Sequence, residues 1–182
     1  GLANEYNDGW FGRYDSTETE LTTINVTPAI ALEATEWLSL GLGADIQYAD
    51  ADLRSAVFVG AGNEGVSRLE GDDWSAGYNI GALIKPMQNT EIGIHYRSAI
   101  SHRLDGKIIV EGTGTAADSV ENGTADLDLP DIATFGIAHQ LSPKTRLMGQ
   151  ATWFGWNNFQ DITAIEDDGT VRQSVIQNYK TT

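Results

Sequence analysis

A two-residue alternation of apolar and polar side chains runs through most of this chain, and it constrains the fold more than any other feature. The alternation is clearest between Trp37 and Val57. One face of this segment carries Leu38, Leu40, Leu42, Ala44, Ile46 and Tyr48, and the other carries Ser39, Gly41, Gly43, Asp45 and Gln47. Helical periodicity is almost absent from any window of about eleven residues. The chain is therefore predicted to be all-β.

The same pattern predicts further strands, which brings the total to about eight long strands. They lie at about 2–6, 21–34, 73–85, 90–111, 132–141, 145–164 and 171–180. Within 90–111, Ile92, Ile94, Tyr96 and Ile100 are expected on one face, because side chains two apart in a strand point the same way.

Short and long connections alternate along the chain. The short ones lie at 34–36, 86–89 and 142–144. The long ones, most of them rich in acidic residues, are expected at about 7–20, 58–72, 112–130 and 164–170. This order predicts an antiparallel up-and-down meander, within a single domain over 1–182, whose long loops gather at one end. Outer-membrane β-barrels have this layout, with short periplasmic turns and long extracellular loops.

Charge and motifs exclude several classes of function. Lys and Arg number 11 against 26 Asp and Glu, a net charge of -15, which argues against a nucleic-acid partner. No nucleophile, phosphate-binding or zinc-protease motif occurs, and the three histidines lack metal-ligand spacing. The sequence therefore predicts no enzyme, no cofactor and no metal site.

The two faces of the predicted strands favour a membrane barrel over a soluble β-sandwich. The polar face is rich in Gly, Asn, Gln and Ser rather than in the Lys, Glu and Thr of a solvated sheet. The apolar face places aromatic residues near segment ends, where they are expected to form interfacial girdles: Trp37, Trp74, Tyr78, Tyr96 and Trp153.

Polar residues on the predicted lumen face are candidate ligand contacts. They are Arg97, Lys85, His95, Asn79, Gln47 and Arg146. A cation in this set, above all Arg97, could bind a carboxylate ligand. The alternative is an ion pair of Arg97 with Asp45 or Glu91 that only braces the barrel, and this is favoured because opposite charges on neighbouring strands usually pair.

Several segments, in order along the chain, resemble the FadL-type long-chain fatty acid transporters of the Gram-negative outer membrane. Among them are NEYNDGWFGRY at 4–14, LSLGLGADIQYADADL at 38–53, IGIHYRSAISHRLDG at 92–106, LPDIATFGIAHQLSP at 129–143 and ATWFGWNNF at 151–159. The resemblance implies a 14-stranded transmembrane β-barrel, plugged by an N-terminal hatch, in the bacterial outer membrane. It also implies passive transport of hydrophobic compounds, above all long-chain fatty acids, without covalent chemistry.

The family's hatch and last strands are not recognisable, so the chain is expected to be a central piece of such a barrel. Expected partners are a fatty acid or other apolar small molecule and outer-membrane lipid or lipopolysaccharide. The isolated piece is expected to oligomerise through open sheet edges. Two alternatives remain open: a soluble lipocalin-like or β-sandwich ligand-binding protein, and a structural or adhesive outer-membrane barrel.

Overall fold

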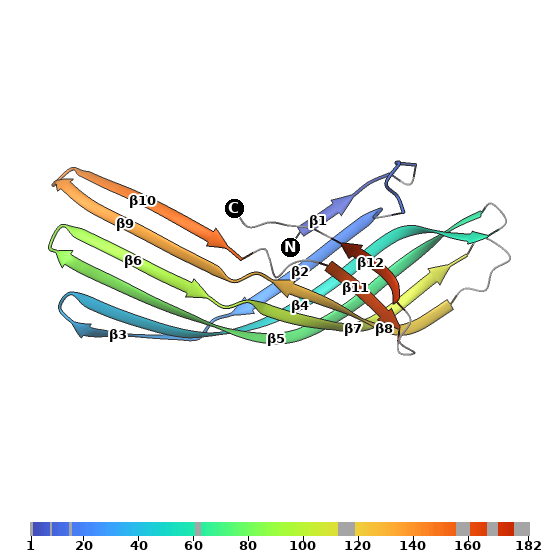
Figure 1. Cartoon of the computed structure of the whole chain (residues 1–182), viewed down its shortest axis with the longest axis horizontal. Coiled ribbons are helices and arrows are strands. Elements are labelled where there is room, and N and C mark those ends of the chain that lie inside the picture. Colours follow the sequence, from blue (N-terminus) through green and yellow to red (C-terminus); the bar gives the residue numbers. More distant parts are fainter. Residues whose placement is uncertain are drawn as a thin grey trace.

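The structure, a computed structural model, describes residues 2–7, 9–14, 16–60, 63–112, 119–155, 161–166 and 171–176 (Figure 1). Its strands are β1 Leu2–Glu5, β2 Glu18–Val26, β3 Ala29–Thr35, β4 Leu38–Gly60, β5 Asn63–Met87, β6 Thr90–Arg97, β7 Ile100–Glu111, β8 Ser119–Leu129, β9 Ile132–Ser142, β10 Thr145–Phe154, β11 Asp161–Glu166 and β12 Val171–Ile176. Within these residues, no helix is long and apolar enough to cross a membrane.

The described strands form one antiparallel sheet in which the chain makes eight passes. Four passes consist of two strands each, because the pass is interrupted between β2 and β3, β6 and β7, β8 and β9, and β10 and β11. The short turns after β3, β5 and β9 gather at one end of the sheet, and the connections after β1, β4 and β7 lie at the other (Figure 1). The predicted meander of about eight strands is confirmed.

The hairpin of β4 and β5 is the frame of the sheet. Its pairing runs from Leu38 opposite Ile84 to Gly60 opposite Asn63. β2 and β3 pair along the free edge of β4, while β6 and β7 pair along the free edge of β5. The interruption between β2 and β3 contains Pro28, which has no backbone N–H to give to a ladder.

The expectation of a long loop at 58–72 is wrong. β4 continues to Gly60 and β5 begins at Asn63, so the hairpin is paired through most of this stretch. Its acidic residues suggested a loop, but they belong to paired strands whose outer face is charged. Asp52 opposite Glu70 is one such pair.

The other predicted loops are shorter than expected wherever the structure describes them. The first ends where β2 begins at Glu18, and β8 occupies 119–129 of the predicted 112–130. β11 extends to Glu166, and the rest of the predicted 164–170 loop lies outside the described residues. Acidic strand residues again caused the error.

Near the short turns, the outer face of the sheet is apolar and exposed. Its exposed side chains include Ile30, Leu32, Leu40, Leu42, Ile46, Ile80, Ile94, Phe135, Ile137 and Leu147. Along β4 this band runs from Trp37 to Tyr48, which is about 36 Å at about 3.3 Å per residue. A tilt of about 45° reduces that length to a height of about 25 Å, the height of the apolar band of a transmembrane barrel.

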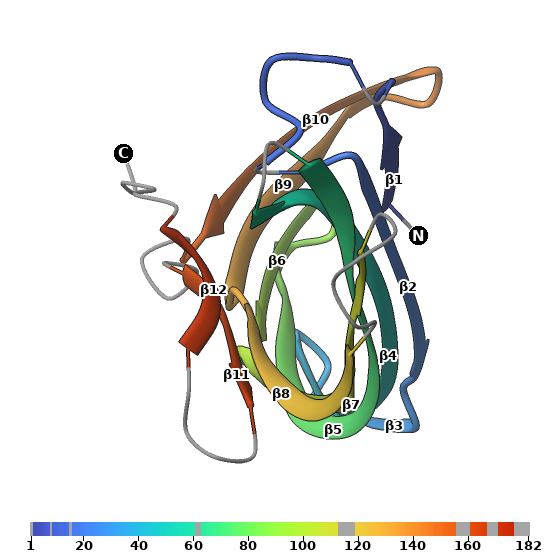
Figure 2. The ribbon, with the colours of Figure 1, turned by 90° about the vertical axis from the view of Figure 1, so that its right-hand side faces the viewer.

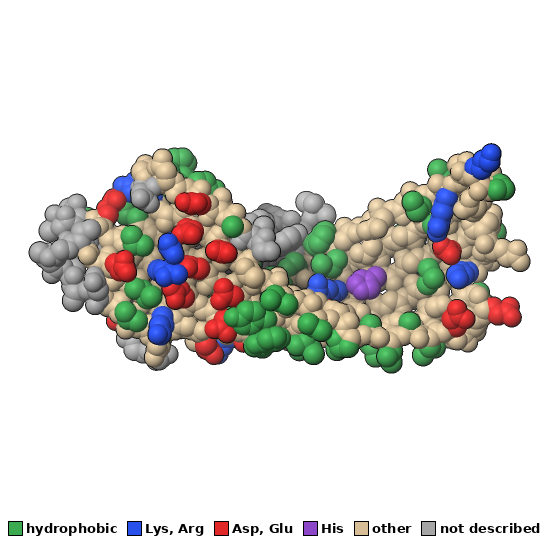
Figure 3. Space-filling model, turned by 180° about the vertical axis from the view of Figure 1, so that it is seen from behind, with side chains coloured by type: hydrophobic (Ala, Val, Ile, Leu, Met, Phe, Trp, Pro, Cys, Tyr) green, Lys and Arg blue, Asp and Glu red, His purple; other side chains and the backbone are tan. Residues whose placement is uncertain are grey.

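Beyond Tyr48, toward the long loops, the polarity of the two faces is reversed. The inner face there is a buried apolar cluster of Ala49, Ala51, Leu69, Leu104, Ile108, Ala125 and Leu127. The outer face carries acidic and basic side chains, which cover that end in Figure 3, while hydrophobic side chains gather along the lower middle. The sheet curls around this cluster, to which the consecutive strands β4, β5, β7 and β8 all contribute (Figure 2).

A shift in the strand phase accounts for part of the reversal. In β6 the odd-numbered residues share the inner face with Asn79 and Gly81, whereas in β7 the even-numbered residues are buried. One extra residue at the break inverts every later side chain, as a β-bulge does. Ile100, expected on the outer face with Ile94, is therefore inside and only 2% exposed.

The curl also needs a close approach of two backbones. Gly71 of β5 pairs with Gly106 of β7, which in turn pairs with Gly123 of β8. A Cβ added to Gly106 would lie 1.7 Å from the carbonyl oxygen of Glu70 and 2.6 Å from the Cα of Gly71. Only glycine fits at Gly106 without separating the strands.

We predict that Gly106→Ala destabilises the outer-membrane protein that carries this chain by about 1–3 kcal/mol, the usual cost of overpacking. Gly93→Ala is the matched control, because no atom lies within 4 Å of a Cβ added there. The measurement is the unfolding midpoint of both variants in detergent. Equal midpoints would show that the backbone approach at Gly106 does not constrain the sheet.

Candidate functional site

The most buried carboxylate in the described residues is Asp45, on the inner face of β4, where it is 2% exposed. Its Oδ1 accepts hydrogen bonds from Asn25 Nδ2 at 2.8 Å and Thr27 Oγ1 at 2.7 Å. Its Oδ2 accepts one from Asn79 Nδ2 at 2.9 Å. Three donors from both neighbouring strand passes thus replace the water that a buried carboxylate loses.

Arg97 at the end of β6 completes this cluster. Its Nη2 lies 3.5 Å from Asp45 Oδ1 and makes no hydrogen bond within the described part of the chain. The side chain keeps 29% of its surface exposed. The bracing pair predicted between Arg97 and Asp45 is present, whereas Glu91 pairs instead with Arg146 at 2.5 Å.

A second polar cluster lies one row further toward the long loops. His102 Nδ1 is 3.0 Å from Asp73 Oδ2, and His102 Nε2 is 3.0 Å from Gln47 Oε1. Gln47 pairs in the sheet with Ser75 and Asn25, so this cluster adjoins that of Asp45. Together the two clusters form a polar layer beneath the apolar interior of the loop end.

The remaining lumen candidates lie nearer the short turns. His95 pairs with Gly81, and Lys85 is exposed beside the turn that follows β5. Arg146 borders a hollow of about 190 Å³ with Gln88, Asn89 and Gln140. A neighbouring hollow of about 400 Å³ is lined by Leu83, Glu91, Gly93, Gly136, Met148 and Gln150. The structure thus brings Gln47, Asn79 and Arg97 together but leaves Lys85 and Arg146 apart from them.

The predicted interfacial aromatics point outward. Trp37, Trp74, Tyr78 and Trp153 are 53%, 63%, 51% and 45% exposed. Tyr48 packs against Trp74 with ring centroids 5.2 Å apart, and Tyr78 packs against Tyr96 at 6.2 Å. These positions are compatible with a girdle at the edge of the apolar band, which stays a prediction.

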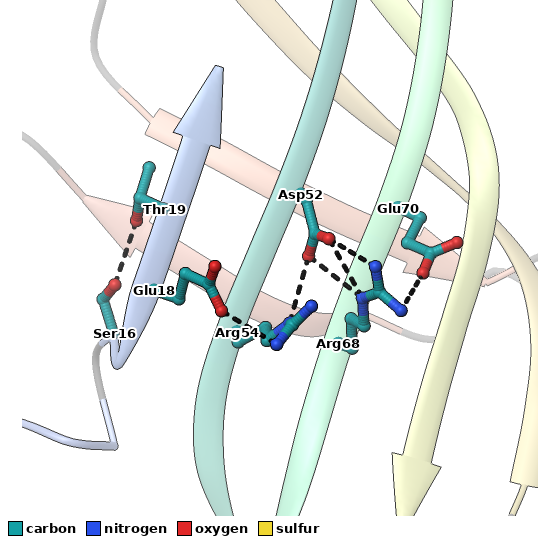
Figure 4. A network of polar contacts seen from close by, with 7 residues as sticks. All are labelled: Ser16, Glu18, Thr19, Asp52, Arg54, Arg68 and Glu70. Carbon is teal, nitrogen blue, oxygen red and sulfur yellow. Dashed lines mark hydrogen bonds and ion pairs between the residues drawn. The ribbon is translucent and has the colours of Figure 1, made fainter. Parts of the chain in front are cut away.

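An ionic network covers the outer face above that band, on β2, β4 and β5 (Figure 4). Arg54 Nη1 lies 2.8 Å from Glu18 Oε2, and Arg68 contacts Asp52 and Glu70 at 2.5 Å each. The Arg68 guanidinium lowers the pKa of the Asp52 carboxyl by donating hydrogen bonds to it. The network keeps this face charged, in contrast to the apolar inner face of the same strands.

The loop between β1 and β2 is latched to the tip of the β4–β5 hairpin. Arg13 donates to both carboxylate oxygens of Glu64, at 2.6 and 3.0 Å, and Tyr14 donates to the same carboxylate. The backbone N–H of Ala56 donates to the carbonyl of Arg13 at 2.8 Å. The Arg13 and Tyr14 hydrogen bonds lower the pKa of Glu64 to about 2.

Aromatic side chains gather on this latched loop. Tyr6 stacks on Trp10 at 4.3 Å, and Trp10 meets Phe11 edge-on at 5.1 Å. Phe11 is 93% exposed, and Phe58 near the end of β4 is 63% exposed. The tip therefore offers apolar surface to the surroundings.

Sequence reasoning missed Asn25, Thr27, Asp73 and His102 as members of the polar layer. Asn25 interrupts an otherwise apolar and β-branched run, which was the available signal, whereas Thr27 fits that run and gave none. The inward position of His102 depends on the phase shift before β7, which alternation alone does not locate. Across the described ranges, no group of three or more His, Cys, Asp or Glu side chains is placed to hold a metal ion.

We predict that Asp45→Ala lowers the free energy of unfolding by about 3–5 kcal/mol, because it leaves Arg97 and three donors without their buried acceptor. Glu91→Ala is the matched control and is expected to cost no more than about 1 kcal/mol, since the Glu91–Arg146 pair is 41% and 48% exposed. Denaturant unfolding of the outer-membrane protein that carries this chain measures both. Similar losses would contradict the assignment of Asp45 as the centre of the layer.

We also predict that the Arg13–Glu64 latch survives acid. A carboxylate whose pKa is depressed in the folded state contributes its full stabilisation at pH values above its ordinary pKa. For Glu64 that stabilisation is lost only as the pH falls through its folded pKa of about 2. Hydrogen exchange of the Ala56 N–H, followed from neutral pH down to about pH 2, reports the latch. Glu64→Gln should weaken protection at every pH; loss of protection near about pH 4 in the unmodified protein would oppose this assignment.

Comparison with known proteins agrees with this geometry. The sequence profile of the family described as "Outer membrane protein transport protein (OMPP1/FadL/TodX)" matches residues 1–182. A long-chain fatty acid transport protein of Escherichia coli O6:H1 is 24% identical over 204 residues, which cover 93% of this chain and 46% of the relative.

Two solved structures share the fold. A Pseudomonas aeruginosa FadL homologue superposes with a TM-score of 0.90 at 22% identity, over 99% of this chain and 48% of its own. The toluene transporter TbuX of Ralstonia pickettii gives a TM-score of 0.81 at 17% identity, over 99% of this chain and 56% of its own. The chain spans about half the length of these relatives. It is part of a transmembrane β-barrel of the Gram-negative outer membrane and belongs to the OMPP1/FadL/TodX family of outer-membrane transport proteins, which are not enzymes.

Proposed function

We propose that the outer-membrane protein that carries this chain takes up hydrophobic compounds by passive diffusion, and that long-chain fatty acids are its cargo. The observation that carries the proposal is the reversed polarity of the loop end. An apolar interior enclosed by a charged exterior is what an apolar compound needs to leave water without entering lipid first. Family membership excludes the soluble lipocalin-like alternative.

The exposed aromatics at the tip supply the first contact in this proposal. Phe11 and Phe58 lie where a compound would arrive from outside, and Trp10 supports Phe11. Aromatic rings bind both alkyl chains and aromatic hydrocarbons, so this contact selects for apolarity rather than for one cargo.

Arg97 is the proposed contact for the fatty acid carboxylate. It is partly exposed, and its pairing with Asp45 is longer than a hydrogen bond. Lys85, His95, Asn79, Gln47 and Arg146 remain proposed lumen contacts of lesser weight. The relatives support both cargo classes, since one is named a long-chain fatty acid transport protein and another a toluene transporter.

Contacts with the membrane and between chains are also proposed. The apolar band faces outer-membrane lipid, and the charged face above it lies at the height of lipopolysaccharide head groups. β1 and β12 end the order of the described sheet, so an isolated chain would associate through these edges.

We predict that Arg97→Gln lowers uptake of a long-chain fatty acid about tenfold, the effect of losing one hydrogen bond to a charged group. Uptake of the uncharged alcohol of equal chain length should not change. Lys107→Gln, a charge removed from the outer face of β7, is the matched control. The measurement is uptake of labelled compounds by cells that carry each variant, after heat-modifiable migration has confirmed folding.

Equal loss for the acid and the alcohol would contradict the role of Arg97 in binding carboxylates but leave transport standing. If cells with and without the unmodified protein take up both compounds at the same rate, passive uptake by this protein is wrong. Persistence of fatty acid uptake after Arg97 and Lys85 are both changed to Ala would show that neither cation is needed.

A further inference from the structure

The pairing of β5 with its neighbour is interrupted in the wall of the barrel. The register stops where Asn79 meets Arg97 and resumes where Asp72 meets Asp105. Six residues of β5, from 73 to 78, thus lack ladder partners on the side of β6 and β7, although all six pair with β4 on the other side. This stretch lies at the height of the Tyr78–Tyr96 pair, beside the edge of the apolar band.

Side chains connect the strands across the interruption. Ser75 Oγ donates to the carbonyl of Ser101 at 2.6 Å, and the backbone N–H of Tyr78 donates to Ser98 Oγ at 3.0 Å. Asp73 Oδ2 accepts from the backbone N–H of Arg103 at 3.3 Å. One backbone hydrogen bond also crosses the interruption, from the N–H of Ser98 to the carbonyl of Tyr78 at 2.9 Å, so a few separate bonds hold the wall here in place of a continuous ladder.

His102 is the central member of these connections. Its side chain is 0% exposed, and each ring nitrogen lies 3.0 Å from an oxygen atom. Asp73 on β5 supplies one oxygen and Gln47 on β4 the other, so one ring of β7 reaches two strands. A neutral imidazole has one N–H and one lone pair, whereas an imidazolium has two N–H groups.

The surroundings of His102 contain few other charges. Asp73 faces it from β5 and Asp45 lies two residues from Gln47 on β4, with Arg97 of β6 beside Asp45. From β8, the cross-strand neighbour is the apolar Leu127. Asp45 is already paired with Arg97, so Asp73 is the carboxylate in direct contact with the ring.

We propose that His102 is a proton-operated clamp that holds β7 against β5 and β4 where the ladder is interrupted. The imidazolium donates one N–H to Asp73 and one to Gln47. The neutral ring keeps only one of these bonds unless the Gln47 amide turns to donate. The clamp concerns the wall itself and does not depend on the cargo of the protein.

The sign of the pH dependence follows from this geometry. The clamp is complete when the ring is protonated, so it weakens as the pH rises through the range of imidazole titration, about pH 5 to about pH 8. The segment 98–104 should then exchange its backbone hydrogens more readily. The segment 132–138, which is paired along its length with both β6 and β10, should not respond.

The test is hydrogen exchange, followed by mass spectrometry, on the complete outer-membrane protein that carries this chain. After correction for intrinsic exchange, protection of 98–104 should fall about tenfold between about pH 5 and about pH 8. Gln47→Glu, which cannot donate, should move the transition to higher pH. Asp73→Asn should move it to lower pH, and His102→Gln should abolish it.

A second measurement does not need the His102 variant to fold. Nitrogen-15 spectra of histidine-labelled protein should show two protonated ring nitrogens for His102 at the acid end, with one proton lost in step with the protection of 98–104. His139, bonded to Thr90 through Nδ1, is the internal control. A His102 ring that is neutral at about pH 5, or shifts of equal sign in Gln47→Glu and Asp73→Asn, would overturn the proposal.

Discussion

The pairing between β4 and β5 is the interaction on which the rest of this structure depends. No unpaired backbone group is tolerated where a strand faces hydrocarbon, so the wall needs at least one hairpin that crosses the whole band. β4 and β5 supply it, from Leu38 opposite Ile84 to the tip at Gly60. Each interrupted pass beside this hairpin pairs with it on both sides of the interruption. The chain can therefore change register in the middle of the pass and still pair with the same hairpin.

The register change lets one sheet serve two environments. In the apolar band, Leu42 and Ile46 point to lipid while Asp45 points inward; beyond it, Arg103 points outward while Leu104 is buried. A strand without a register shift can present opposite polarities at its two ends only if its hydrophobic pattern moves from one set of alternate residues to the other, as it does in β4 after Tyr48. From β6 to β7 the apolar residues stay on even positions, and the phase shift at the break alone moves them from the outer to the inner face. The same reversal made acidic strands resemble loops in the sequence.

Alternation and loop order were sufficient to predict the all-β class, the meander and the short turns, because these depend on local spacing. The extent of β5 and β8 could not be predicted in this way. Glu70 and Asp126 lie in stretches as rich in acidic residues as a loop, and only their cross-strand pairing identifies them as strand residues. The Arg97–Asp45 pair was predictable as one of two options from alternation, which places both side chains on the inner face, although β5 lies between their strands. The contact of His102 with Gln47 was not, since the inward position of His102 follows from a one-residue shift that alternation does not locate.

The polar layer needs a physical account, because it lies across the interior that the proposed cargo would enter. An unpaired polar group there would hold water and oppose an apolar compound. Asp45, however, has three donors, and both ring nitrogens of His102 lie at hydrogen-bond distance from oxygen atoms within the chain. A layer satisfied internally can contact hydrocarbon without further desolvation, so it confers rigidity more than a barrier. Arg97 is the exception, with one nitrogen lacking a hydrogen bond in the described chain. Discrimination between a fatty acid and a neutral hydrocarbon would then depend on this residue, while the apolar interior above it treats the two alike.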